Sequence, residues 1–209
     1  MPEPLQHEAL WRFASFLAVL LLMATWEWLA PRRGRCLPRR LRWPHNLALA
    51  AIDALLIRLL FPASALGFAV LAETRGWGLM QMTQAGAWPA ILATVVALDC
   101  VIYWQHRLFH ALPSLWRVHR VHHADVDLDV STGLRFHPLE ILLSMLIKAA
   151  AILLLGAPAA GVLLFEILLN GTAMFNHANV RLPPAADRLL RLVIVTPDMH
   201  RVHHSVRRE

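Results

Sequence analysis

Long apolar runs constrain this chain of 209 residues more than any other feature. The first run covers residues 10–29, about the length that an α-helix needs to cross the hydrocarbon core of a bilayer. Trp11 lies near its start and Trp26 and Trp28 near its end, as in the aromatic belts at membrane interfaces. Acidic residues precede the run and arginines follow it, the reverse of a cleaved signal peptide, so we expect an anchor.

Two more segments of spanning length follow. Residues 47–71 are apolar apart from one aspartate and one arginine, and residues 76–98 contain no charged side chain. Pro89 suits the first turn of a helix, so we expect a helix that starts there and continues into His106.

The last two apolar runs are residues 141–155 and 159–175, separated by Gly156, Ala157 and Pro158. Because both runs are short and the break between them is tight, they predict a short helical hairpin. The pattern as a whole predicts an all-α fold, an integral membrane helical bundle with about four to five membrane segments.

Composition excludes several other classes of protein. Hydrophobic residues make up 57% of the chain and charged residues 16%, which excludes a disordered chain. Two cysteines are too few for a disulfide scaffold or for an iron–sulfur cluster. The net charge of +6 comes from arginines that lie between the apolar runs, which favours a role in membrane topology over nucleic-acid binding.

The arginines also predict the orientation in the membrane. Six of them lie within residues 31–45, whereas the next loop has only Arg75, beside Glu73. The positive-inside rule therefore places residues 31–45 in the cytosol and the N-terminus outside. Counting onwards, residues 106–138 and 177–209 are expected on the cytosolic face as well.

Ten of the twelve histidines lie in the second half of the chain, and eight of them form three boxes with helical spacing. The boxes are His106 and His110; His119, His122 and His123; and His200, His203 and His204. So many neighbouring imidazoles without a metal would repel when protonated and would leave buried nitrogens without partners. The pattern therefore predicts a cytosolic metal site, and eight ligands require two metal ions.

Ligand type alone leaves iron, zinc, copper and nickel open, since neutral imidazole binds all four. The clusters contain no cysteine, unlike most structural zinc sites, and the chain has no HExxH motif, P-loop, GxSxG or GxGxxG. A redox pair of irons fits this donor set best.

The ordered boxes, together with the segments RFHPLE at residues 135–140 and NHAN at 176–179, resemble the fatty acid hydroxylase superfamily, which includes sterol desaturases. The resemblance covers residues 88–205. It implies a nonheme diiron centre that uses O2 and two electrons, with the eight box histidines as iron ligands. It also implies that His177 is a ninth ligand, and that His137 is either a ligand or a residue that supports one.

Residues 1–87 are therefore expected to be membrane anchor helices and residues 88–209 a fatty acid hydroxylase-like catalytic region. Family members usually continue beyond the last box, so this region is expected to be truncated at Glu209.

Ligand histidines usually donate their second N–H to a carboxylate or a carbonyl. Asp99 lies seven residues before His106, near the same helical face, and is the first candidate for that role, with an interhelical salt bridge as the alternative. Glu140 and Asp198 are further candidates. Three aspartates follow the second box, at positions 125, 127 and 129, and are interpreted as a solvated loop.

The function expected is a membrane-bound, O2-dependent oxidoreductase that hydroxylates or desaturates a C–H bond of a lipid such as a sterol or a fatty acyl chain. The chain has no flavin or haem motif, so a separate reductase, ferredoxin or cytochrome must supply electrons, docking on the arginine-rich face. The alternatives are a non-catalytic membrane protein that binds zinc or iron, and an inactive truncated family member.

Overall fold

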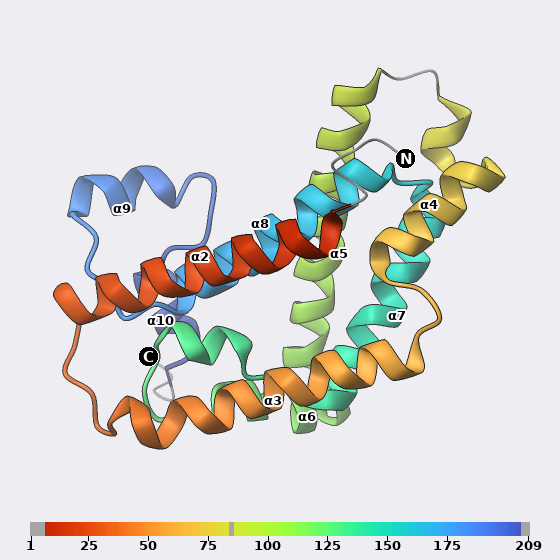
Figure 1. Cartoon of the computed structure of the whole chain (residues 1–209). Helices are drawn as coiled ribbons and strands as arrows, with labels where there is room; N and C mark the ends of the chain where they lie inside the picture. Colours follow the sequence, from red (N-terminus) through yellow and green to blue (C-terminus); the bar gives the residue numbers. More distant parts are fainter. Residues whose placement is uncertain (1–6, 84–85, 206–209) are drawn as a thin grey trace.

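A computed structural model describes residues 7–83 and 86–205, and in these residues all the regular structure is helical (Figure 1). Five of its segments are long and apolar enough to cross a membrane. They are Glu8–Leu29, Arg39–Met82, Ala87–Ala111, Pro138–Leu155 and Ala159–His177. The expected all-α, multi-pass membrane architecture is thus confirmed; Glu3 and the chain end at Glu209 lie outside the described residues.

Helix α2 (Glu8–Leu29) matches the first expected segment and packs along α8 (Ala159–His177), as Figure 1 shows. Nearly all of its surface is apolar and only Met23 and Glu27 are buried, so most of its side chains face away from the rest of the chain. This suits a helix surrounded by lipid. The buried Glu27, in the last turn of this helix, belongs to the polar network described below.

The second expected segment, residues 47–71, contains two helices, α3 (Arg39–Leu60) and α4 (Ala65–Arg75), with a break between them that the apolar pattern does not show. Proline disfavours helical backbone in the residue before it, and Phe61, before Pro62, is extended with φ −105° and ψ 127°. The chain resumes a helix at Ser64, whose hydroxyl oxygen accepts a hydrogen bond from the N–H of Gly67 at 3.2 Å. Helix α3 also begins eight residues earlier than expected, and its first turn therefore includes arginines of the basic loop.

Helices α5 (Ala87–Ala111) and α6 (Pro113–His123) carry the first two histidine boxes, which are helical as expected. The join between them has the same cause as the break after α3. Leu112, before Pro113, is extended with ψ 122°, and Pro113 then occupies the first turn of α6. The third box lies on the short helix α10 (Pro197–His203) and its C-cap residue His204, and α10 follows α9 (Pro184–Leu190).

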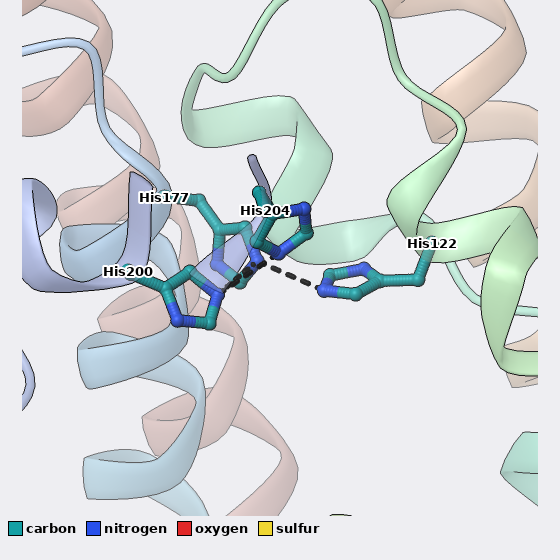
Figure 2. A group of neighbouring side chains, drawn as sticks. All are labelled: His122, His177, His200 and His204. Carbon is teal, nitrogen blue, oxygen red and sulfur yellow. Dashed lines mark hydrogen bonds between the residues drawn. The ribbon is translucent and has the colours of Figure 1, made fainter. Parts of the chain in front are cut away.

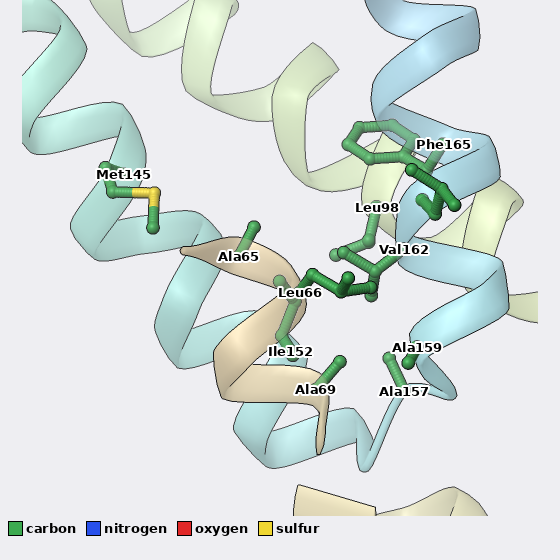
Figure 3. Packing of buried hydrophobic residues seen from close by; sticks show 11 residues of the cluster. Ala65, Leu66, Ala69, Leu98, Met145, Ile152, Ala157, Ala159, Val162 and Phe165 are labelled. Atoms are coloured by element: carbon green, nitrogen blue, oxygen red, sulfur yellow. The ribbon is translucent and has the colours of Figure 1, made fainter. Parts of the chain in front are cut away.

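Helices α7 (Pro138–Leu155) and α8 are joined at the expected break, where Gly156 ends α7 with a left-handed φ of 63°. The two helices diverge from this turn and do not pack along their lengths (Figure 1). Helix α7 packs on α3, α4 and α5, and α8 packs on α2, α4 and α5. Buried apolar side chains from α4, α5, α7 and α8 form a core where these four helices meet (Figure 3).

Two one-turn 3-10 helices complete the described fold, η1 (Leu79–Met82) and η2 (Val130–Leu134). Helix η2 packs against α8, α3 and α2 and lies between the second histidine box and α7. It therefore brings the loops around the histidines into contact with the N-terminal helices.

Candidate metal centre

Nine of the ten histidines predicted as ligands converge from four helices. They come from the C-terminal ends of α5 and α8 and from the short helices α6 and α10. Their ring nitrogens form sets in which all the ligand atoms lie within 4.8 Å of one another. These residues are His106, His110, His119, His122, His123, His177, His200, His203 and His204.

One set, the four-histidine group, consists of His122, His177, His200 and His204 (Figure 2). The Nε2 atom of His177 lies 3.0 Å from that of His122 and 2.9 Å from that of His200. The Nε2 atoms of His200 and His204 are 3.1 Å apart. Four ring nitrogens from three helices thus face a common point.

In this group, two of the ring nitrogens that face one another carry no proton and can bind a cation. The Nδ1 atoms of His122 and His177 lie 3.0 Å and 2.6 Å from the backbone oxygens of Arg135 and Ala173. A carbonyl oxygen only accepts hydrogen bonds, so each Nδ1 carries the ring proton, and each neutral ring has a bare Nε2. Two bare nitrogens 3.0 Å apart cannot share a hydrogen bond, and a metal ion satisfies both.

The other five histidines form the five-histidine group, which consists of two overlapping sets: His106, His110 and His203, and His110, His119 and His123. The buried Nε2 atoms of His110, His119 and His123 have no hydrogen-bond partner among the described residues. Buried polar atoms in native proteins are almost always paired, so three convergent exceptions mark a site for a ligand. A further set of His123, His203 and His204 joins the two groups.

The carboxylate that holds a site histidine is Glu140, in the first turn of α7. Its Oε1 atom accepts a hydrogen bond from Nδ1 of His119 at 2.7 Å, and both side chains are buried. This contact fixes the tautomer that leaves Nε2 of His119 bare. Glu140 was one of the further candidates from the sequence.

Burial keeps several of the site histidines outside the membrane-spanning segments neutral, the state in which imidazoles bind metals. Burial, followed by the neighbouring histidines, lowers the pKa of His122, His200 and His204 well below the usual value near 6.5. The same causes lower the pKa of His123 to about 2.

His137 and Asp99 lie elsewhere. His137 is the N-cap of α7, and its Nδ1 accepts a hydrogen bond from the N–H of Leu139 at 3.1 Å. Asp99 is exposed on α5, and no described ion pair or hydrogen bond joins it to a histidine or to another helix. Asp198 pairs with Arg32 at 3.1 Å rather than with a ring nitrogen.

The three aspartates after the second box do not form a solvated loop, so that interpretation is wrong. Arg42 of α3, itself 5% exposed, pairs with Asp125 and Asp129, each at 2.7 Å. The carboxylate of Asp127 accepts hydrogen bonds from the backbone N–H groups of Cys36 and Leu37. The basic residues and these aspartates were expected on the same face of the membrane, but nothing in the sequence indicated that they form ion pairs.

Glu27 of α2 was missed by the sequence analysis and is fully buried beside the site. One carboxylate oxygen accepts hydrogen bonds from the backbone N–H groups of Val130 and Asn179, at 2.7 and 2.8 Å. The other pairs with Arg39 at 2.6 Å. An acidic residue in the last turn of an apolar segment, followed by arginines, was the only signal for it.

Fold and site together define an all-helical, multi-pass membrane protein with a centre of nine clustered histidines. The fatty acid hydroxylase family model matches residues 91–209, more than half of the chain, and the chain belongs to that family. The resemblance inferred from the boxes is thus confirmed.

Among curated proteins, the chain is 33% identical over 121 residues to ornithine lipid hydroxylase OlsE of Rhizobium tropici. It is 31% identical over 110 residues to alkylglycerol monooxygenase of Homo sapiens and 30% identical over 126 residues to that of Danio rerio. These matches cover 56%, 53% and 60% of this chain, but only 36%, 24% and 27% of the relatives' own lengths. No solved structure matches.

Proposed function

We propose that this protein is a membrane-bound, O2-dependent nonheme diiron enzyme that hydroxylates a C–H bond of a lipid. The observation that carries the proposal is the set of bare, convergent Nε2 atoms in both histidine groups. The relatives named as a lipid hydroxylase and as monooxygenases support this chemistry over desaturation.

Each histidine group would hold one iron ion. His122, His177, His200 and His204 form one ligand set, and His106, His110, His119, His123 and His203 form the other. Bound iron would supply activation of O2 for attack on an unactivated C–H bond. The protein contributes a fixed set of neutral imidazoles, held in one tautomer by Glu140 and by the carbonyl oxygens of Arg135 and Ala173.

The proposal includes the surroundings of the site. Residues 31–45 contact the loops of the metal centre through Arg42 and Cys36, so the arginine-rich loop and the histidines lie at the same end of the molecule. The positive-inside rule puts this end in the cytosol, with the N-terminus outside. A lipid substrate would enter from the bilayer, and a separate electron donor would dock on the basic face. We also assign residues 1–87 as anchor helices and residues 88–209 as the catalytic region.

Metal content tests the proposal. The wild-type protein, purified anaerobically in detergent with iron supplied, should contain about two irons per chain, since the nine ligands form two groups. His122→Ala should lose iron because it removes one bare nitrogen from the four-histidine group. His137→Asn is the matched control: asparagine also caps helices, and this variant should keep both irons.

Zinc in place of iron, or no stoichiometric metal in the wild type, would contradict the proposal and favour the non-catalytic alternative. Equal iron in the wild type and in His122→Ala would contradict the ligand assignment.

A further inference from the structure

Helix α3 reaches the metal centre although it precedes the region matched by the family model, and it packs against η2 and α7 (Figure 1). Two of its three buried side chains, Arg42 and Asn46, lie one helical turn apart and face the segment 125–135. This segment joins the second histidine box to α7. The position of α3 therefore bears directly on the loops that surround the ligands.

Asn46 is fully buried, and each end of its side-chain amide is paired. Its Oδ1 accepts a hydrogen bond from Nη1 of Arg135 at 2.9 Å. Its Nδ2 donates to Oδ2 of Asp125 and to Oγ of Ser131, both at 2.9 Å. Two of these contacts hold the amide in place, and the third fixes Arg135 relative to α3.

Arg135 in turn contacts His122 and the residue before it. Its Nε donates to the backbone oxygen of Val121 at 2.8 Å, and its own backbone oxygen accepts from Nδ1 of His122 at 3.0 Å. The next residue, Phe136, stacks on the His122 ring with centroids 4.5 Å apart and planes 7° from parallel. The orientation of the His122 ring thus depends on the placement of Arg135.

We propose that Asn46 is a positioning residue for His122 and acts through Arg135. Helix α3 thereby helps to orient a ligand of the metal centre. The inference rests on the proposed function only in assuming that the four-histidine group binds a metal. Residues that orient a ligand histidine typically change metal affinity 10–100-fold when they are replaced. Loss of the Asn46 contact should therefore weaken one metal site and leave the other unchanged.

Titration of metal-free protein in detergent with Co²⁺, followed by visible absorption, tests this inference without an activity assay. Wild type should bind two ions. Asn46→Ala and Arg135→Lys should each weaken one of the two sites about 10–100-fold. Because both changes act on one chain of contacts, the double variant should be about as weak as the single ones. His45→Ala changes the exposed neighbour of Asn46 and should bind like wild type.

Thermal unfolding of each metal-free variant separates positioning from loss of fold. If Asn46→Ala does not fold, Arg135→Lys decides alone. Wild-type affinity at both sites in a folded single variant would overturn the inference, as would strictly additive losses in the double variant. Failure of wild type to bind two ions would instead contradict the proposed function.

Discussion

At the scale of single residues, the chemistry depends on which ring nitrogen of each histidine carries a proton. Glu140 decides this for His119, because its buried carboxylate accepts the Nδ1 proton at 2.7 Å. Neither residue's neighbours in sequence reveal the pairing. The helical spacing of the boxes showed that the imidazoles share a face, but not which group holds each ring.

Glu140→Gln should therefore lower the affinity of the five-histidine group for metal about 10–100-fold, since the amide no longer provides a charged acceptor. Metal titration of the purified variant measures the effect. Asp198→Asn is the control, because that carboxylate pairs with Arg32 and contacts no ring, and its titration should match wild type. Unchanged affinity in Glu140→Gln would show that the tautomer of His119 has another determinant.

At the scale of elements, the turns between helices depend on close backbone contacts. Gly156 ends α7 with φ 63°, and a Cβ atom there would lie 2.3 Å from the backbone oxygen of Trp77. Gly76 ends α4 with nearly the same φ of 64° but has open space around it. Comparing these two glycines separates the effect of a left-handed backbone from the effect of a nearby backbone atom.

Gly76→Ala should cost about 1–2 kcal/mol of stability, from the left-handed backbone alone. Gly156→Ala should cost more, since the turn must also move away from residues 77–78. Thermal unfolding of the two variants in the same detergent measures the difference. Equal shifts in Tm would indicate that the contact between the two turns relaxes freely.

At the scale of the whole molecule, orientation in the membrane can be measured through Cys36. This exposed thiol lies in the arginine-rich loop, and its backbone N–H donates to Asp127, beside the metal centre. In a Cys100→Ala variant it is the only cysteine. A membrane-impermeant maleimide should label it in inside-out vesicles and leave it unlabelled in intact cells, if the positive-inside rule holds. The opposite pattern would place the metal centre outside.

The sequence by itself determined the all-helical membrane architecture, the family and the nine histidines that converge, because apolar length and helical spacing are local properties. It also located the turn at Gly156. It missed the break at Pro62, where Phe61 is extended, since the apolar pattern continues across this proline.

Only the tertiary structure decided which polar groups support the histidines. In the structure, Glu140 has the role first expected of Asp99, and His137 caps a helix. Glu27, Arg42 and Asn46 reach the metal centre from helices that were expected only to anchor the protein in the membrane. The contact of Asn46 with Arg135 spans 89 positions in the chain. Such pairings depend on how whole helices pack, and no local periodicity encodes them.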